Sequence, residues 1–250
     1  MNNITTTSQY LEVPESELKE FEVTDPFNDI KLKGIICRRS DYRYGTMVIF
    51  EVDEKIVIPQ IIYGTPKLIY PFDKNGVFHW PKIHQVELWD KLDGTNILAY
   101  HYYNKEGTKF LTYKTRLGPV ISNTEYGPFL NMWKEMLSEN DWIVAVISQN
   151  QDWNLSFELY GSRNPITIQY DIPLATKLIF GVNKQDHSIM PPSVLNTDCF
   201  SAKCFPEKWN FNADDVTSLY QFVRAEMSKS NSDVLRQEGV VFYADIGEIS

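Results

Sequence analysis

The sequence predicts an α+β protein with mostly antiparallel sheets and flanking helices. Two observations carry this prediction. Many short runs of apolar and β-branched residues are separated by turns of only a few residues, which is typical of consecutive strands that pair as hairpins. Two longer segments, near residues 125–139 and 212–229, instead place apolar residues at helical spacing.

The N-terminal part of the chain divides into a polar segment and a strand-rich region. Residues 1–28 are polar and acidic, and we expect a short helix near residues 15–22. The alternating pattern that follows predicts three strands, at residues 30–37, 46–51 and 56–62. We therefore divide the chain into an N-terminal polar segment, residues 1–28, and one folded domain, residues 29–250.

The middle of the chain is expected to form a hairpin around the dipeptide Asp93-Gly94. Asp-Gly favours a tight turn because glycine accepts positive φ, and apolar residues flank it on both sides. The strand after this turn, residues 97–103, should pair with residues 109–113. Further strands are predicted at residues 142–147, 155–161, 166–170, 178–182 and 238–243.

Composition restricts the class of protein. A chain of 250 residues forms one large domain or two small ones. The net charge of −9 argues against a large non-specific nucleic-acid interface, but it allows a local basic groove. Two groups of cations could form such a groove: Lys31, Lys33, Arg38, Arg39 and Arg43, and separately Lys105, Lys109, Lys114 and Arg116. For the first group, scattered solvated charges are at least as good an interpretation.

Cysteine usage and the N-terminus predict a cytoplasmic protein with no membrane partner. Cys37, Cys199 and Cys204 have neither the number nor the spacing of a zinc site or a disulfide framework. No apolar run is long enough to span a membrane, and the first residues lack the regions of a signal peptide.

The hexapeptide Lys91-Leu92-Asp93-Gly94-Thr95-Asn96 is the strongest candidate for chemistry. A lysine held at a strand end beside a carboxylate can act as a covalent nucleophile. The alternative is an ordinary surface hairpin with a solvated lysine. A K-x-D-G tetrapeptide is expected by chance in roughly a few per cent of chains of this length, so the motif alone is a hypothesis.

Four further polar residues, in three segments of the chain, complement this lysine. Lys114 and Arg116 could hold anionic oxygens, the arginine through its planar fork. Glu158 lies in an otherwise apolar strand, where a carboxylate must be paired or must face a site. Glu238 opens the last apolar strand, and together the glutamates could hold a sugar hydroxyl and a hard divalent cation.

These motifs resemble those of the covalent nucleotidyltransferases, and among them the ATP-dependent RNA ligases. Lys91-Leu92-Asp93-Gly94 matches the family's first motif, K-x-D-G, and Thr95-Asn96 follows it as in RNA ligases. Phe157-Glu158-Leu159-Tyr160-Gly161 is similar to the third motif, and Glu238-Gly239-Val240-Val241 to the fourth, E-G-x-V. Each motif is short, but together they occur in the family's order across residues 30–243.

The resemblance implies a nucleotidyltransferase fold of the RNA/DNA ligase type, related to the ATP-grasp fold, and a three-step reaction. Lys91 attacks ATP to form lysyl-AMP, AMP passes to the 5′-phosphate of an RNA end, and a 3′-hydroxyl then displaces AMP. ATP and Mg²⁺ or Mn²⁺ are the implied cofactors, and RNA ends are the partner. Lys91, Asp93 and Glu238 are the implied catalytic residues, with Asp93 and Glu238 also serving the metal.

The resemblance also implies residues that contact the nucleotide. Asn96 or Arg116 would contact ribose or phosphate, Lys114 would hold phosphate oxygens, and Glu158 would bind the ribose. Phe180 is a candidate for stacking on adenine, although core packing is the role that its strand favours.

The sequence departs from the family pattern at its end. The lysine pair of the fifth motif is absent, because no lysine follows Lys229, and no sequence remains for a separate C-terminal domain. We therefore expect ATP binding with slow self-adenylylation that depends strongly on the metal. Two alternatives remain open. One is a non-catalytic nucleotide- or RNA-end-binding module of the same fold. The other is a DNA ligase or mRNA-capping guanylyltransferase, although these usually carry arginine at the position of Asn96.

Overall fold

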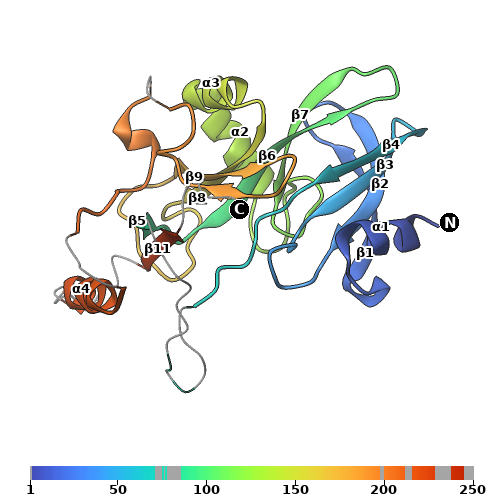
Figure 1. Cartoon of the computed structure of the whole chain (residues 1–250). Helices are drawn as coiled ribbons and strands as arrows, with labels where there is room; N and C mark the ends of the chain where they lie inside the picture. The colour runs from blue at the N-terminus through green and yellow to red at the C-terminus, as the bar shows by residue number, and fades with distance from the viewer. Residues whose placement is uncertain are drawn as a thin grey trace. The chain divides into compact units, whose positions relative to one another are not determined.

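The computed structural model describes residues 2–70, 75, 77, 86–197, 200–211, 216–228 and 238–244. The chain forms two compact units (Figure 1). Unit 1 comprises Met1–Lys67, Asn96–Phe157 and Leu178–Phe200. Unit 2 comprises Leu68–Thr95, Glu158–Lys177 and Ser201–Ser250. The structure thus divides the chain into two units. The division expected from the sequence, a polar segment at residues 1–28 and one domain at residues 29–250, stays a prediction.

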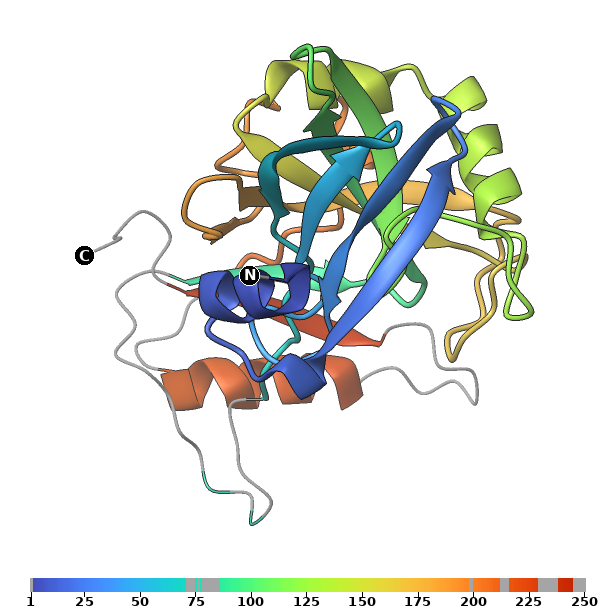
Figure 2. The ribbon, with the colours of Figure 1, turned by 90° about the vertical axis from the view of Figure 1, so that its right-hand side faces the viewer.

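Unit 1 begins with a helix and a four-stranded antiparallel sheet. The strands β1 (Leu18–Asp25), β2 (Ile30–Cys37), β3 (Met47–Val52) and β4 (Lys55–Ile62) pair in sequence order. The helix α1 (Asn3–Leu11) precedes them, and its first turn is capped by the Asn2 side chain, which accepts from the Thr5 amide. In Figure 2, α1 and the strands β1 and β2 lie toward the viewer.

The predicted helix near residues 15–22 is wrong. A single 3₁₀ turn, Glu15–Glu17, is followed at once by β1, whose eight residues pair along their whole length with β2. Phe21 and Val23 of β1 pack against the core of the sheet, so the strand buries apolar side chains that a helix would have placed differently. The sheet partner, rather than local propensity, decides the structure in this segment.

The second sheet of unit 1 has the order β10-β9-β8-β6-β7. Its strands are β6 (Thr95–Tyr103), β7 (Lys109–Thr115), β8 (Trp153–Tyr160), β9 (Ala175–Asn183) and β10 (Ile189–Met190). The hairpin predicted between β6 and β7 is confirmed, with Tyr103 opposite Lys109. β6, β8 and β9 continue in sequence into unit 2.

The two sheets of unit 1 share a core. Tyr100 and Tyr102 of β6 pack with apolar residues of the first sheet, including Leu32 and Met47. The fully buried carboxylate of Asp25 accepts hydrogen bonds from the Tyr102 hydroxyl (2.8 Å) and from the Thr112 hydroxyl (2.7 Å). A buried carboxylate needs such partners, and these bonds tie the last residue of β1 to strands β6 and β7.

Two helices pack against the second sheet: α2 (Phe129–Glu139) and α3 (Trp142–Gln149). The ring of Trp133, in α2, contacts the rings of Tyr113 in β7 and Phe157 in β8, and the ring centroids lie 5.3 Å and 5.6 Å away, respectively. The strand predicted at residues 142–147 is therefore wrong. Its buried residues Ile143, Val146 and Ile147 follow helical spacing, which a run of β-branched residues had obscured.

Unit 2 contains a two-stranded antiparallel sheet of β5 (Val86–Lys91) and β11 (Gly239–Ala244), with the helix α4 (Val216–Ser228). Leu88 of β5 packs with Leu219 and Val223 of α4 and with Phe242 of β11. The predicted start of this helix near residue 212 lies outside the described residues. A short 3₁₀ helix, Ala202–Cys204, completes the elements described in this unit.

The hairpin predicted around Gly94 is also wrong, since β5 pairs with β11 while β6 joins the five-stranded sheet. Gly94 is not among the glycines with positive φ. It is required for a different reason: a Cβ at this position would collide with the backbone carbonyl of Leu159. The strand predicted at residues 166–170 is absent as well, because that segment forms a loop of bends.

Two findings concern only the described part of the chain. It contains no helix that is long and apolar enough to cross a membrane. Cys37 and Cys204 are free and buried there, as expected for reduced structural cysteines, whereas Cys199 lies outside the described residues.

Candidate active site

Lys91 and Glu238 form an ion pair in unit 2 although they lie far apart in the sequence. The antiparallel register between β5 and β11 causes this, because it places Gly239 opposite Lys91 and brings the preceding Glu238 to the lysine. Both side chains keep about a third of their accessible surface, 32% for Lys91 and 31% for Glu238. The lysine of the first motif and the glutamate of the fourth are thus in direct contact and within reach of solvent.

The carboxylate of Asp93 holds a loop of unit 2 in place. Its Oδ2 atom accepts hydrogen bonds from the backbone amides of Thr167 (2.5 Å) and Ile168 (2.6 Å). The side chain is buried, with 6% of its surface exposed, and these two bonds compensate the burial of its charge. Asp93 therefore fixes the backbone two residues after Lys91.

The third motif lies against the first through backbone contact. Gly94 packs on the backbone of Leu159, the residue after Glu158, and Asn164 donates from Nδ2 to the Leu159 carbonyl (2.7 Å) and to the Thr95 hydroxyl (3.0 Å). Glu158 itself is buried, with 9% of its surface exposed. All of these residues belong to unit 2, so three motifs that are separate in sequence converge there.

Tyr170 is a site residue that the sequence analysis missed. Its hydroxyl accepts a hydrogen bond from the Asp93 amide (2.9 Å), and its ring packs edge-on against Tyr160 at 4.9 Å. Burial and the negative charges of Asp93, Glu158 and Glu238 raise the pKa of Tyr170, so the phenol stays protonated at neutral pH. A single tyrosine in an irregular loop gives no sequence signal of this role.

Lys114 lies in unit 1 in a different environment from Lys91. Its side chain is fully buried, and its ammonium donates to the backbone carbonyls of Gly45 (3.1 Å), Thr115 (3.0 Å) and Arg116 (3.0 Å). Burial and the charge of Arg116 lower the pKa of Lys114 to about 7. In this structure the ammonium joins the β2–β3 loop to the end of β7, and its predicted contact with phosphate would require these bonds to open.

Arg116 of unit 1 retains capacity for a ligand. Its Nε is buried and has no hydrogen-bond partner among the residues that the structure describes. Its guanidinium carbon lies 5.9 Å from the centre of the Tyr44 ring. A buried guanidinium nitrogen without an acceptor is costly, and an anionic oxygen would satisfy it.

The other two predicted nucleotide contacts also lie in unit 1. The Asn96 amide is held on both sides, since its oxygen accepts from the Thr65 hydroxyl (2.7 Å) and its nitrogen donates to the Ser156 hydroxyl (2.7 Å). Phe180 is 9% exposed within β9 and belongs to the buried apolar residues. Their contacts with a nucleotide stay predictions.

The comparisons with known structures concern the fold. Two structures described as archaeal ATP-dependent RNA ligase, form 1 and form 2, each align with a TM-score of 0.57 and 14% identity, over 100% and 98% of this chain. A protein from Aquifex aeolicus described as an ATP-dependent DNA ligase aligns with a TM-score of 0.57 and 16% identity, over 95% of this chain. The chain has the fold of the ATP-dependent ligases.

The similarity covers only part of each ligase structure. The chain spans 63, 62 and 58% of the lengths of the three ligase structures. No protein-family model and no curated protein matches the sequence. The ligase-type α+β fold expected from the motifs is confirmed, and at these identities the ligase structures establish the fold alone.

Proposed function

We propose that this chain is the adenylyltransferase part of an ATP-dependent RNA ligase, which joins 5′-phosphate and 3′-hydroxyl RNA ends through a lysyl-AMP intermediate. The contact between Lys91 and Glu238 is the observation that carries the proposal. It unites two motifs that the sequence separates widely, on a fold shared with ATP-dependent ligases. The packing of Gly94 on Leu159 adds the third motif to the same unit.

The reaction would use Lys91 as the nucleophile. Its neutral amine forms a bond from Nζ to the α-phosphorus of ATP while the bond between that phosphorus and the β-bridging oxygen breaks, and pyrophosphate leaves. The 5′-phosphate of an RNA end then displaces Lys91 from AMP. A 3′-hydroxyl finally attacks the activated phosphate and releases AMP. Asp93 positions the lysine by holding the backbone that follows it.

The donor set near Lys91 fits a divalent cation shared with phosphate. Mg²⁺ usually keeps several waters and binds through one or two carboxylates plus substrate oxygens, and Glu238 offers a partly exposed carboxylate at the nucleophile. The described residues contain no cluster of three His, Cys, Asp or Glu side chains, so a site made of protein ligands alone is not found among them. Glu238 would hold the ion, which would neutralise phosphate charge. Asp93 could contribute through Oδ1.

The preference for RNA rests on one residue of the first motif. DNA ligases and capping enzymes usually carry arginine two residues after the motif's glycine, where this chain has Asn96. The structures with this fold include proteins described as RNA ligases and one described as a DNA ligase, so the fold does not decide between the two substrates. Oligonucleotides with RNA or DNA ends would decide it.

The test is the intact mass of the protein after incubation with ATP and Mg²⁺. We expect a gain of one adenylyl group, and we expect Lys91→Arg to abolish it, because a guanidinium stays protonated and cannot attack. Lys208→Arg is the matched control, since Lys208 also pairs with a glutamate in unit 2, at 2.6 Å from Glu87. An adduct that persists in Lys91→Arg would refute the assignment.

A second arm of this experiment separates the alternatives. Addition of a 5′-phosphorylated RNA with a blocked 3′ end should move the adenylyl group from protein to RNA. GTP in place of ATP should give no adduct, whereas a capping guanylyltransferase would accept it. Absence of any adduct with ATP would leave a nucleotide- or RNA-end-binding module as the better description of the chain.

A further inference from the structure

The loop between β2 and β3 carries an unusual concentration of arginine in an acidic protein. Arg38, Arg39 and Arg43 are three of the seven arginines in the chain, and they fall within six residues. The net charge of the protein is −9, so such a group is not explained by overall composition. The loop and the residues that it contacts belong to unit 1.

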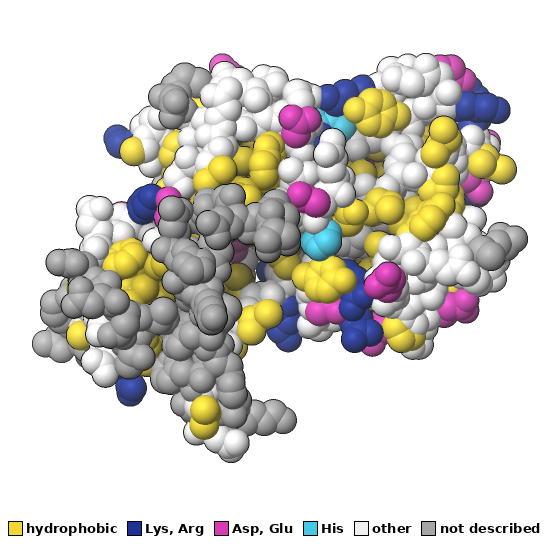
Figure 3. All heavy atoms as spheres, viewed as in Figure 1, with side chains coloured by type: hydrophobic (Ala, Val, Ile, Leu, Met, Phe, Trp, Pro, Cys, Tyr) yellow, Lys and Arg dark blue, Asp and Glu magenta, His cyan; other side chains and the backbone are white. Residues whose placement is uncertain are grey.

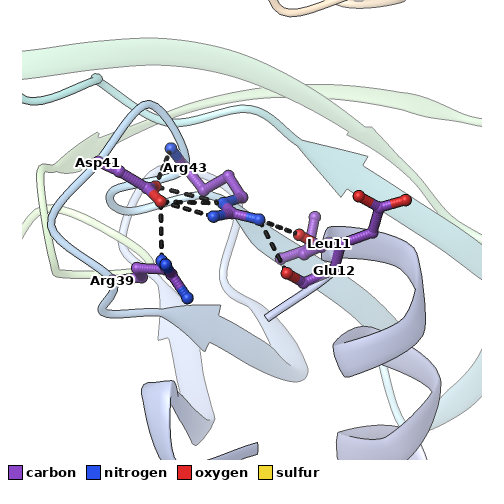
Figure 4. Close-up of polar contacts among 5 residues, drawn as sticks. All are labelled: Leu11, Glu12, Arg39, Asp41 and Arg43. Atoms are coloured by element: carbon purple, nitrogen blue, oxygen red, sulfur yellow. Dashed lines mark hydrogen bonds and ion pairs between the residues drawn. The ribbon is translucent and has the colours of Figure 1, made fainter. Parts of the chain in front are cut away.

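Arg43 makes this loop rigid (Figure 4). Its Nη1 donates to the carbonyls of Leu11 and Glu12 at the C-terminal end of α1, both at 2.9 Å. Its Nε and Nη2 bind the carboxylate of Asp41, at 2.6 Å for the shortest bond, and Arg39 Nε binds the same carboxylate at 2.9 Å. Asp41 is thus neutralised by two arginines, and the loop is fixed to the helix.

The rigid loop presents an aromatic surface. The guanidinium of Arg43 lies over the Tyr42 ring, 4.6 Å from its centre. The next ring is that of His187, which stacks on Tyr42 at 5.2 Å with an interplanar angle of 21° and also contacts Tyr63 at 5.3 Å. We call Tyr42, Tyr63 and His187 the aromatic platform. Tyr42 is 52% exposed and His187 is exposed. On the face drawn in Figure 3, histidine side chains lie beside hydrophobic, basic and acidic side chains.

The turn between β9 and β10 holds His187 in this position. The backbone amide of Asn183 donates to the Ser188 carbonyl (2.9 Å), and the backbone carbonyl of Asn183 accepts from the His187 amide (3.2 Å). His187 adopts a left-handed backbone conformation, with φ of 57°. Such a conformation is uncommon for residues other than glycine, and the turn maintains it while the ring stays exposed.

The same turn begins with Lys184, which lies near His101 and is influenced by the charge of Lys109. Lys184 donates from Nζ to the Gln151 carbonyl (2.6 Å) and lies 3.3 Å from His101 Nδ1, while Lys109 bonds to the Gln151 side chain. We call His101, Lys109 and Lys184 the basic cluster. No ion pair joins Lys109 or Lys184 to a carboxylate within the described parts of the chain. Burial and the neighbouring positive charges lower the pKa of Lys184 to about 8 and that of His101 to about 4.

We propose that the aromatic platform and the basic cluster form one path for single-stranded RNA across the β9–β10 turn. Lys184 and His187 are three residues apart, so their Cα atoms are at most about 11 Å apart, a separation that a few nucleotides cover. Exposed rings stack on unpaired bases of any sequence, and lysines bind the phosphates between them. The assignment of RNA as the strand rests on the proposed ligase function, since that activity requires a bound RNA end.

The test measures binding of a fluorescent single-stranded RNA of about twelve nucleotides to the full chain by fluorescence anisotropy. The platform variant carries Tyr42→Leu and His187→Asn, which remove the rings while asparagine tolerates the left-handed backbone. The cluster variant carries Lys109→Gln and Lys184→Gln. The matched controls are Tyr126→Ala, an 83% exposed tyrosine of unit 1, and the pair Lys19→Gln with Lys55→Gln, exposed lysines of the same unit.

Each variant has a distinct expected signature. Loss of base stacking should weaken RNA binding about tenfold or more in the platform variant, with an unchanged dependence on salt. The cluster variant should weaken binding and make the slope of log affinity against log salt shallower by about 0.7 for each lost phosphate contact. The controls should bind like the unaltered chain, and a duplex of the same sequence should bind more weakly than the single strand because its bases are already stacked.

Two outcomes would overturn the whole inference, and a third would overturn its stacking part. One is RNA binding that neither variant changes, and the other is a chain that forms the adenylyl adduct yet binds no single-stranded RNA. A duplex that binds as tightly as the single strand would remove the stacking role. The mass assay with ATP tests the proposed function separately. If no adduct forms while RNA binding still depends on the platform and the cluster, the path stands and the ligase activity fails.

Discussion

Lys91 and Lys114 were predicted to serve the same kind of ligand, and the structure gives them opposite surroundings. Lys91 in unit 2 is about one-third exposed and paired with the carboxylate of Glu238. Lys114 in unit 1 is fully buried, with three backbone carbonyls around its ammonium, and its pKa is lowered to about 7. One lysine can meet a substrate without disturbing the fold, whereas the other is part of the fold.

The difference shows that residue type alone does not separate an accessible, ion-paired lysine from a buried structural one. An accessible amine beside a single carboxylate can exchange that partner for a ligand or a metal. An ammonium group whose three hydrogens all bind backbone carbonyls has no donor left for phosphate. Four experiments test this contrast, two on the lysines themselves and two on Asp93 and Glu238 of the candidate site, and the first should change stability the most.

Replacement of each lysine by alanine should show the largest difference in stability between the surroundings of Lys114 and those of Lys91. Lys114→Ala leaves a cavity and deprives three carbonyls of their donor, so we expect it to lower the free energy of unfolding by roughly 3 kcal/mol or more. Lys91→Ala should change it by less than about 1 kcal/mol, as for other exposed ion pairs. Urea denaturation of both variants measures the two values, and equal losses would refute the distinction.

Removal of the Asp93 charge should affect stability and catalysis together. Asp93→Asn weakens the charged acceptor of two backbone amides, so we expect a loss of about 1.5–3 kcal/mol in unfolding free energy. Adenylylation should slow by about tenfold or more, because the backbone after Lys91 loses its anchor. Asp171→Asn, an exposed aspartate of the same loop, is the control, and a similar loss in both variants would remove the special role of Asp93.

The lowered pKa of Lys114 predicts a pH dependence of stability. Between pH 7 and its ordinary value of 10.5, the unfolded chain binds a proton at this lysine that the folded chain does not. The free energy of unfolding should therefore rise with pH in this window, by up to about 1.4 kcal/mol per pH unit, and the full penalty should remain below pH 7. Lys114→Met should flatten the profile measured by urea denaturation at pH 7, 8 and 9. A slope in Lys114→Met identical to that of the unaltered chain would contradict this origin.

The smallest effect on stability is expected at Glu238. Glu238→Gln removes half of an ion pair that is about one-third exposed, so the unfolding free energy should change by less than about 1 kcal/mol. The substitution should instead raise the Mg²⁺ or Mn²⁺ concentration that adenylylation requires. Adenylylation rates across a metal titration measure this, with Glu87→Gln as the matched control in the same sheet. An unshifted titration would exclude Glu238 from the metal's surroundings.

The sequence predicted most strands of the fold because hydrophobic patterns of strands are local. It failed where tertiary contacts decide the structure. Residues 142–147 were expected to form a strand because valine and isoleucine are β-branched, yet they bury Ile143, Val146 and Ile147 as one helix face. The hairpin expected at Gly94 failed because the partner of β5 is β11, at the other end of the described chain.

Short motifs identify the residues of the candidate site that the fold brings into one unit, whereas contacts with distant backbone have no sequence signal. Lys91, Glu158 and Glu238 stand in motifs of fixed composition, and the structure brings them into one unit. The structural role of Lys114 depends on the carbonyl of Gly45, which no sequence pattern links to it. The same holds for Tyr170, whose contact with the Asp93 amide arises from the path of an irregular loop.

The register between β5 and β11 has a consequence for the charge partner of Lys91, the proposed nucleophile. Side chains alternate between the faces of a strand, so a slip of one residue in this six-residue ladder would turn Glu238 away from Lys91 and expose the amine without its counter-charge. The packing of Leu88 and Phe242 with α4 is what opposes such a slip. A change in α4, which contributes no residue to the candidate active site, would therefore remove the charge partner of Lys91.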